Sequence, residues 1–236
     1  IPFVATFHSK YRDDFERTFH NKSIAKYLTN KIVDLYNKAD EVWIPQAMIE
    51  DTIREYGYKG KLYVIENGND FAGTSEIAKL RIEAREMFQI APNENVFLFV
   101  GQHIWEKNTK MIIEALAKIK DTPFKMYFIG TGYAADDMKQ LVTDFEITDK
   151  VKFVGIVLDR ELLKRYYAAA DLFLFPSIYD NAPLVVREAS ALQTPAVLVK
   201  DSTASEVITD NFNGFLIENT ASSLAEKIRE LTANPL

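Results

Sequence analysis

Short apolar runs alternate with stretches of helical spacing from about residue 95 to the end of the chain. The runs are rich in valine, isoleucine and phenylalanine: VFLFV, KMYFI, VKFV, LFLFP, AVLV and FLI. The stretches between them predict helices near residues 108–120, 133–145, 159–169, 183–193, 203–210 and 221–232. Because the runs are apolar on both faces, they are typical of strands buried between two layers of helices. The sequence therefore predicts an α/β fold with a six-stranded, doubly wound parallel sheet, which binds ligands beyond the carboxyl ends of its strands.

The first 72 residues contain a smaller set of the same elements. Three runs predict strands, IPFVATF, EVWIP and KLYVIE, and two helical segments are expected near residues 12–38 and 46–57. An apolar stripe on the longer segment is expected to face the core; it comprises Phe15, Phe19, Ile24, Leu28, Ile32 and Leu35. These elements make about half of a second sheet domain, and we expect the other half upstream, since the chain does not begin with methionine. A charged helical stretch over residues 74–90 leads into the second region, so the boundary is predicted between residues 72 and 73.

Composition argues against several classes of function. The net charge of −6 would repel a polyanion, so no nucleic-acid partner is expected. The chain has no cysteine and only three histidines, His8, His20 and His103, which are not spaced as metal ligands; neither a metal nor another cofactor is expected. No apolar run approaches the roughly 20 residues that span a bilayer, and the chain does not open with a signal peptide, which favours a cytoplasmic protein.

One stretch combines a proline-led helix start with two acids. In PSIYDNAPLVVREASALQTP, residues 176–195, Pro183 suits the first turn of a helix because its nitrogen has no hydrogen to leave unpaired. The N–H groups near Leu184 and Val185 would then point outward and, with the helix dipole, form a seat for phosphate. Asp180 precedes this seat and Glu188 lies one turn into the helix, where they could accept hydroxyl hydrogens of a sugar and of a ribose. On spacing alone, a capping aspartate and a solvated glutamate are equally compatible.

The stretch PSIYDNAPLVVREASALQTPAV resembles the loop and helix that mark the retaining glycosyltransferases of family four. FVGQHIWEKN is similar to the family's phosphate loop, and VKFVGIV and LKRYYAAADLFLFPS are similar to the segments that line its base pocket. In the first region, TFHS and VIENGND resemble motifs of the family's acceptor domain. The resemblance implies a GT-B fold of two Rossmann-like domains. Residues 1–72 would be the carboxyl-terminal half of the acceptor-side domain, which is then incomplete, and residues 73–236 the domain that binds the nucleotide-sugar donor.

The resemblance also implies roles for individual residues. Glu188 would hold the ribose hydroxyls, Asp180 the hydroxyls of the donor sugar, and Lys107 would neutralise the departing diphosphate. Further donor contacts are implied for Gly101, Gln102, Gly132, Ile156, Asn181, Leu184 and Val185, with Ile156 meeting the base through its backbone. His8 would reach the donor sugar or its phosphate from across the cleft. Without the resemblance, Lys107 could equally be a solvated charge, Ile156 a strand-end packing residue, and His8 a capped loop residue.

Two positions depart from the family pattern. Gln102 stands where arginine or lysine is usual, which removes one of two cations expected to face the diphosphate. Asp180 replaces the usual glutamate and is one methylene shorter, so a sugar hydroxyl must lie closer or be bridged by water. We expect an altered donor preference more than a loss of catalysis. Asn67 and Gly68 are expected to form a tight turn at the exit into the linker.

The resemblance indicates transfer of a sugar, with retention of its anomeric configuration, from a UDP-sugar, favoured over a GDP-sugar, to an unidentified saccharide or lipid-linked acceptor. By analogy the product is a bacterial cell-surface polysaccharide or glycoconjugate. The chain contains no D-x-D pair, which counts against a metal-dependent glycosyltransferase. A peripheral contact with the inner face of the membrane is expected only through the region upstream.

Two other functions stay open. FIGTGYAA places Gly130, Gly132 and Ala135 in a G-x-G-x-x-A pattern after a strand, which is typical of a nicotinamide-dependent oxidoreductase. The next strand, however, ends in Gly155 rather than in the acid that would hold an adenosine ribose. Gly132 would instead let the backbone turn close to the donor. A catalytically silent nucleotide-sugar-binding protein is the third candidate, because Gln102 carries no charge.

Overall fold

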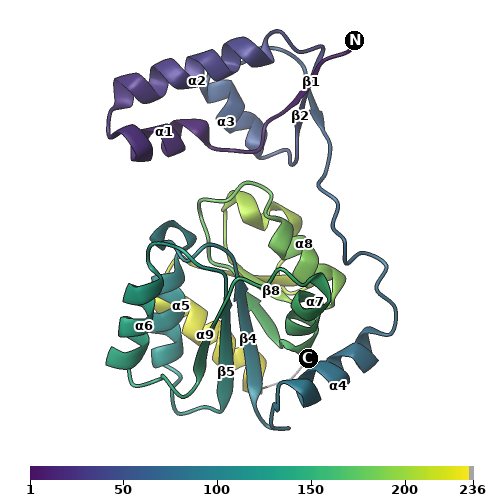
Figure 1. Ribbon diagram of the computed structural model, residues 1–236, viewed down its shortest axis with the longest axis vertical. Helices are drawn as coiled ribbons and strands as arrows, with labels where there is room; N and C mark the ends of the chain where they lie inside the picture. The colour runs from purple at the N-terminus through teal and green to yellow at the C-terminus, as the bar shows by residue number, and fades with distance from the viewer. Residues whose placement is uncertain (234–236) are drawn as a thin grey trace. The chain divides into compact units, whose positions relative to one another are not determined.

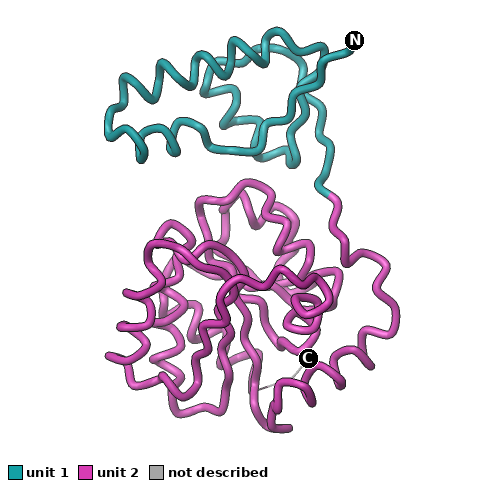
Figure 2. The backbone as a smooth tube through the Cα atoms, viewed as in Figure 1, with its two compact units in different colours: residues 1–67 teal, residues 68–236 magenta. Residues whose placement is uncertain are grey.

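The computed structural model describes residues 1–233 and contains two compact units, Ile1–Asn67 and Gly68–Leu236, which Figure 2 shows in different colours. The predicted boundary, between residues 72 and 73, lies a few residues further along the chain. Within the described residues, no helix is both long enough and apolar enough to cross a membrane.

The first unit contains a three-stranded parallel sheet, as the sequence predicts. Its strands are β1 (Val4–Thr6), β2 (Glu41–Ile44) and β3 (Leu62–Val64), in the order β1-β2-β3. Helix α3 (Ile49–Glu55) connects β2 to β3, within the predicted helical segment 46–57. The strands are shorter than the apolar runs that predict them, although Phe7 N and Ile65 N, just past the ends of β1 and β3, still donate to Trp43 O at 2.8 Å and to Ile44 O at 2.9 Å.

The long helix predicted over residues 12–38 is wrong, because the chain forms two helices there. Helix α1 spans Tyr11–Phe19 and helix α2 spans Lys22–Tyr36. His20 ends α1 in the left-handed conformation, with φ of 49°. The Asn21 side chain then accepts hydrogen bonds from the next free amides, at 2.9 Å from Ser23 N and 3.2 Å from Ile24 N. This cap starts a new helix, so the apolar period of α1 does not continue into α2.

The predicted core-facing stripe is also wrong. Phe19, Ile24 and Leu35 are 47%, 43% and 48% exposed. The buried face of α2 runs instead through Ala25, Thr29, Val33 and Tyr36. Helix α2 packs against α1, and Tyr36 packs edge-on against Phe7 with ring centroids 5.9 Å apart.

The second unit contains the predicted six-stranded sheet, and every neighbouring pair of strands is parallel. The strand order is β6-β5-β4-β7-β8-β9. The strands are β4 (Asn95–Val100), β5 (Phe124–Ile129), β6 (Val151–Gly155), β7 (Leu172–Leu174), β8 (Ala196–Val199) and β9 (Gly214–Ile217). Since the order reverses direction between β4 and β7, a ligand crevice is expected beyond the carboxyl ends of these two strands.

Helices cover the sheet of the second unit on both faces (Figure 1). Helices α5, α6 and α9 pack together on one face, and α4, α7 and α8 on the other. Their bounds are α4 (Ile77–Met87), α5 (Thr109–Ala117), α6 (Ala135–Asp144), α7 (Arg160–Ala169), α8 (Leu184–Ala191) and α9 (Ala221–Ala233). The six strands bury side chains such as Phe97, Phe99 and Phe128 in one continuous core. The doubly wound α/β prediction is therefore confirmed for this unit.

The helix predicted over 203–210 is a short 3₁₀ helix, η2 (Thr203–Val207). Serine hydroxyls compete there for the backbone carbonyls: Ser202 Oγ donates to Val199 O at 2.7 Å and Ser205 Oγ donates to Ser202 O at 2.8 Å. These local hydrogen bonds offer the backbone an alternative to an α-helical ladder, and Ile208 is already extended.

A carboxylate between α7 and β7 fastens α4 to the sheet. Asp171 accepts hydrogen bonds from Val96 N at 2.7 Å, from Arg85 at 3.0 Å and from Arg81. The two arginines also donate to the last carbonyl groups of α7 and its cap, at Ala168, Ala169 and Ala170. Asp171 and the two arginines thereby connect α4 to the amino end of β4 and to the end of α7.

Candidate functional site

Loops that follow neighbouring strands meet at the carboxyl edge of the second sheet. Gly101, Gln102 and Lys107 follow β4, and Asp180 and Asn181 follow β7, the strand beside it. Gly132 follows β5, and Ile156 follows β6, further along the same edge. All of the predicted donor-site residues of this unit that lie in loops are therefore at one edge, at and beside the point where the strand order reverses.

Lys107 and Asp180 form an ion pair across this edge. Lys107 ends the 3₁₀ helix η1 (Trp105–Lys107), and its ammonium nitrogen donates to Asp180 Oδ1. The side chains are only 12% and 16% exposed. The ammonium also lies 5.8 Å and 5.9 Å from the ring centroids of Phe175 and Tyr179. Lys107 is therefore not a solvated surface charge.

Asp180 keeps one carboxylate oxygen for a ligand. Its Oδ2 is buried and makes no hydrogen bond to any described residue. Its backbone carbonyl accepts from the Thr203 hydroxyl, which fixes the loop. The helix α8 starts after Pro183 without a side-chain cap, so the capping alternative for Asp180 does not hold. A buried unpaired carboxylate oxygen is costly, and a ligand hydroxyl would satisfy it.

The start of α8 presents two amides to the same edge. Leu184 and Val185 are the first two residues of the helix, so their N–H groups have no acceptor inside it. Together with the positive end of the helix dipole they favour an anion. Ala182, just before the helix, has φ of 30°, an unusual value for a residue with a side chain. The loop that leads into α8 is thus held in a strained turn beside the anion seat.

Glu188 lies one turn into α8 and is buried, with 7% of the residue exposed. Its Oε1 accepts from Arg160 at 2.8 Å and its Oε2 from the Tyr167 hydroxyl at 2.9 Å. Burial, and then the charge of Glu188, raise the pKa of Tyr167 well above its usual value, so the phenol stays protonated and donates. The solvated alternative for Glu188 is therefore wrong. Each of its oxygens retains a lone pair for a further donor.

Sequence reasoning missed Arg160 and Tyr167 as members of this site. Both belong to α7, and only the fold brings them to Glu188. Asp159 caps this helix through its side chain, at 2.9 Å from Glu161 N, which orients its first residue, Arg160. Tyr167 was within a motif that resembles the family's base-pocket segment, but nothing in the sequence links either residue to Glu188.

The glycines of the G-x-G-x-x-A pattern have a packing role. A Cβ at Gly130 would lie 2.0 Å from the Gly101 carbonyl oxygen, and a Cβ at Gly132 would lie 2.3 Å from the His103 carbonyl oxygen. Both are distances that no real side chain adopts, so the loops after β4 and β5 pack directly through these two residues. Close packing between the two loops therefore explains why glycine stands at both positions of the G-x-G-x-x-A pattern, and no bound dinucleotide is needed to explain it. Gly132 approaches the loop that follows β4.

The remaining predicted residues lie as follows. His8 follows β1 in the first unit. Ile156 is 64% exposed, so it is not an ordinary strand-end packing residue. The tight turn predicted at Asn67 and Gly68 is wrong, since the turn lies at residues 70–73 and Gly73 takes the positive φ of 80°. Gly68 is not required there, because a Cβ on it would contact nothing within 4 Å.

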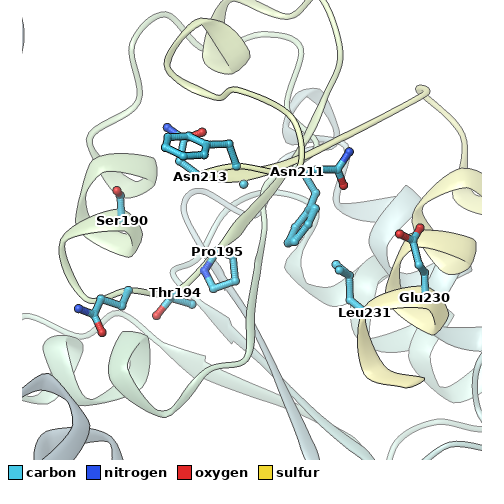
Figure 3. A pocket seen from close by; sticks show the side chains of 11 residues that line it. Ser190, Thr194, Pro195, Asn211, Asn213, Glu230 and Leu231 are labelled. Atoms are coloured by element: carbon cyan, nitrogen blue, oxygen red, sulfur yellow. The ribbon is translucent and has the colours of Figure 1, made fainter. Parts of the chain in front are cut away.

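A separate surface pocket of about 650 Å³ lies at the other edge of the same sheet (Figure 3). Ser190 and Thr194 come from the end of α8 and the turn after it, and Pro195 precedes β8. Asn211 and Asn213 precede β9. Because these positions are at the amino ends of the strands, the pocket is distinct from the site at the carboxyl edge. In the part of the chain that the structure describes, no three histidine, cysteine or acidic side chains gather as metal ligands.

His103 is buried beside the site without a partner for one nitrogen. Its Nε2 makes no hydrogen bond within the described structure, and its ring lies about 6 Å from those of Phe99, Phe128 and Phe153, with centroid distances of 6.2, 6.0 and 6.0 Å. Burial, followed by the charge of Lys139, lowers the pKa of His103. The unfolded chain therefore binds a proton more readily than the folded one.

Replacing His103 with leucine is expected to flatten the pH dependence of stability. In the unchanged protein, stability is full above the ordinary histidine pKa of about 6.5 and falls as the pH drops through the window below it. The leucine variant has no group that takes up a proton on unfolding and no unpaired buried nitrogen at this position. Its free energy of unfolding at acid pH should therefore be about 1 kcal/mol higher than that of the unchanged protein. Urea unfolding at several pH values measures this. His20→Asn, at an exposed position, is the control. If the free energy of unfolding of His103→Leu depended on pH as steeply as that of the unchanged protein, His103 would not be the group responsible.

A family profile described as "Glycosyl transferases group 1" matches residues 81–235, about two thirds of the chain. The chain belongs to this family. The match covers the second sheet together with Asp180, Glu188 and Lys107. The resemblance to glycosyltransferases that was inferred from the motifs is confirmed at the level of this family. The NAD-dependent oxidoreductase is thereby set aside.

This group 1 glycosyltransferase chain has relatives over most of its length. It is 26% identical over 229 residues to an uncharacterised glycosyltransferase of Methanocaldococcus jannaschii, covering 92% of this chain and 56% of that protein. It is 24% identical over 227 residues to the lipopolysaccharide core biosynthesis glycosyltransferase LpsE of Rhizobium meliloti, covering 96% of this chain and 63% of LpsE.

Solved structures show the same fold. The HepE protein of Anabaena in complex with UDP and glucose superposes with a TM-score of 0.78 at 24% identity, covering 99% of this chain and 62% of that one. Sucrose-phosphate synthase of Thermosynechococcus elongatus gives a TM-score of 0.83 at 23% identity, covering 98% and 59%. The GT-B prediction is confirmed. The chain spans 56% to 63% of the length of these four proteins.

Proposed function

We propose that this chain binds the nucleotide-sugar donor of a retaining glycosyltransferase, with UDP-sugars preferred to GDP-sugars. The observation that carries the proposal is the Lys107–Asp180 ion pair beside the uncapped start of α8, with Glu188 buried one turn further in. In this arrangement a cation and two amides can bind a diphosphate. On each side of the diphosphate, a carboxylate can accept a hydrogen bond from a hydroxyl group. A protein of the same fold supports the donor class, since HepE was solved with UDP-glucose.

Each site residue would bind a different part of the donor. The diphosphate would lie against the amides of Leu184 and Val185, with Lys107 turning from Asp180 to the phosphate oxygens. Asp180 would then accept hydroxyl hydrogens of the donor sugar through both oxygens, and Glu188 those of the ribose. Ile156 would meet the base through its backbone, and Gly101, Gln102 and Asn181 would contact the donor from the adjoining loops.

Transfer would break the bond between the anomeric carbon and the phosphate oxygen and form a bond to the acceptor oxygen on the same face of the sugar. The acceptor hydroxyl proton would pass to the departing phosphate oxygen, so no enzyme nucleophile is used. Charge develops on the leaving diphosphate, where Lys107 and the α8 amides stabilise it most. We assign no metal or other cofactor to this step, and His8 would contact the donor sugar or its phosphate from the first unit.

The acceptor is a saccharide or a lipid-linked saccharide, and the product a bacterial cell-surface polysaccharide or glycoconjugate. Support comes from relatives named for such pathways, including LpsE and a galactosyltransferase of Escherichia coli named for a diphosphoundecaprenol acceptor. We place the reaction on the cytoplasmic side of the membrane, with peripheral membrane contact through the region upstream of this chain.

Calorimetric titration of the full-length protein with UDP, GDP, ADP and NAD tests the donor class. UDP is expected to bind most tightly, GDP more weakly, and NAD not at all, because NAD carries a second nucleoside where a nucleotide-sugar carries only the sugar. At 100 times its dissociation constant, UDP should stabilise the fold by about 2.7 kcal/mol. Preferential binding of NAD would contradict the proposal.

A catalytically silent nucleotide-sugar-binding protein is kept as a second candidate by one observation. Gln102 is exposed at the site edge and brings a hydrogen-bonding side chain without charge to the place where a cation is usual. Release of UDP from UDP-glucose in the presence of acceptor extracts separates the two candidates. Tight UDP binding with no release would favour the silent protein.

A further inference from the structure

The Arg160 guanidinium connects Glu188 to the segment that precedes α4. One of its terminal nitrogens lies 2.8 Å from Glu188 Oε1 and 3.3 Å from Asp70 Oδ2. The guanidinium carbon lies 4.3 Å from the centroid of the Phe71 ring, over its face. Arg160 is thus held by a buried acid, an exposed acid and an aromatic face at once.

Phe71 and Tyr167 close a ring of contacts around the same carboxylate. Phe71 is 1% exposed, and its ring meets that of Tyr167 edge-on with centroids 5.9 Å apart. The Tyr167 hydroxyl donates to Glu188 Oε2 at 2.9 Å, while Arg160 donates to Oε1. Two groups of α7 therefore fix the plane of the Glu188 carboxylate, one at each oxygen, and Phe71 packs against both of them.

Within the described residues, Arg160 is the only cation that forms an ion pair with Glu188. The Arg160 side chain is 42% exposed, whereas that of Glu188 is 9% exposed. A buried carboxylate that loses its ion-pair partner is free to rotate. A carboxylate that accepts from two vicinal hydroxyls must present both oxygens in one plane, which is the orientation that these contacts fix.

We propose that Arg160 is a positioning residue that sets the specificity of this site for nucleotides with a 2′,3′-diol, by holding the Glu188 carboxylate in the plane that accepts both ribose hydroxyls. The proposal rests on the proposed function, in which Glu188 holds the ribose. Arg160 acts on the ligand through Glu188 and not by contact with the diphosphate or the base. Removing Arg160 should therefore weaken the binding of only those nucleotides that have the diol.

The test compares UDP with 2′,3′-dideoxy-UDP in calorimetric titrations of the full-length protein and its Arg160→Met variant. The unchanged protein should bind UDP at least tenfold more tightly than the dideoxy nucleotide, because each bond to a charged acceptor is worth a factor of about ten. In Arg160→Met the affinity for UDP should fall about tenfold. The affinity for dideoxy-UDP should stay unchanged, which also shows that the variant is folded.

Lys164→Met is the matched control. Lys164 lies on the same helix, one turn after Arg160, and its ammonium lies 5.7 Å from the centroid of the same Phe71 ring. It pairs with Glu161 at 2.7 Å. This variant should keep the full preference for UDP. Arg160→Lys, which keeps the charge on a shorter reach, should recover part of it.

The contrast between the two nucleotides separates positioning from general support of the fold. If the unchanged protein does not discriminate between the two nucleotides, the ribose role of Glu188 fails with the proposed function. If it discriminates and Arg160→Met does so equally, or if the variant loses both ligands alike, the role of Arg160 is overturned.

Discussion

Replacing Lys107 with alanine is expected to lower the turnover of the full-length protein by a factor of about 100 to 1,000 and to weaken UDP binding as well. Lys107 is the cation that the structure places beside the start of α8, where the leaving diphosphate would gain charge. The loss should appear mainly in kcat, because that charge is largest in the transition state. Initial rates of UDP release over a range of donor concentrations measure it.

Two further variants make the Lys107 result interpretable. Lys110→Ala removes an exposed cation in the first turn of α5, which faces Glu114 at 3.8 Å, and it should leave turnover unchanged. Lys107→Gln keeps a hydrogen-bond donor without the charge, and it should recover only a small part of the rate. Thermal melts of all three proteins show whether each is folded. Activity of Lys107→Ala within twofold of the unchanged protein would remove Lys107 from the mechanism.

Replacing Asp171 with alanine is expected to lower the free energy of unfolding by about 3 kcal/mol. The side chain is 28% exposed and holds two arginines and the amide of Val96. Its loss leaves Arg81 and Arg85 without their acidic partner and the Val96 amide of β4 without an acceptor. The arginines still donate hydrogen bonds to carbonyl groups at the end of α7. The loss of stability is therefore smaller than it would be if the arginines were left with no other partner. Urea unfolding monitored by circular dichroism measures it.

The control for Asp171 is an ion pair of similar length at the surface. Glu146 pairs with Lys120 at 3.0 Å, and the Glu146 side chain is 79% exposed. Glu146→Ala should change the free energy of unfolding by less than about 0.5 kcal/mol, since water solvates both groups. Equal effects of the two substitutions would show that the Asp171 cluster does not anchor α4.

The second sheet could be predicted because its strands are buried on both faces. Runs such as VFLFV and AVLV stay apolar at every position, and the intervening helices have a different period, so each element is marked locally. The first unit shows the limit of this reasoning. A single left-handed residue, His20, and the side chain of Asn21 divide one apolar period into two helices. Side-chain capping of this kind leaves no trace in the apolar pattern.

The candidate site was predictable only in part. Asp180, Glu188 and Lys107 lie in sequence motifs that resemble those of a known family, so the sequence could indicate them together. The partners of Glu188 could not be indicated in this way. Arg160 and Tyr167 reach it only after α7 has packed beside α8, and Asp70 and Phe71 lie 90 and 89 positions before Arg160 along the chain. Contacts of this kind follow from the fold and not from local pattern.

The crystal structure of this protein soaked with UDP-glucose tests the central claim most directly. We expect diphosphate density within hydrogen-bond distance of the Leu184 and Val185 amides, with the Lys107 ammonium moved from Asp180 onto a phosphate oxygen. Ribose hydroxyls should lie on Glu188 and glucose hydroxyls on Asp180. Nucleotide density at another edge of the sheet, with Lys107 still paired to Asp180, would contradict the account.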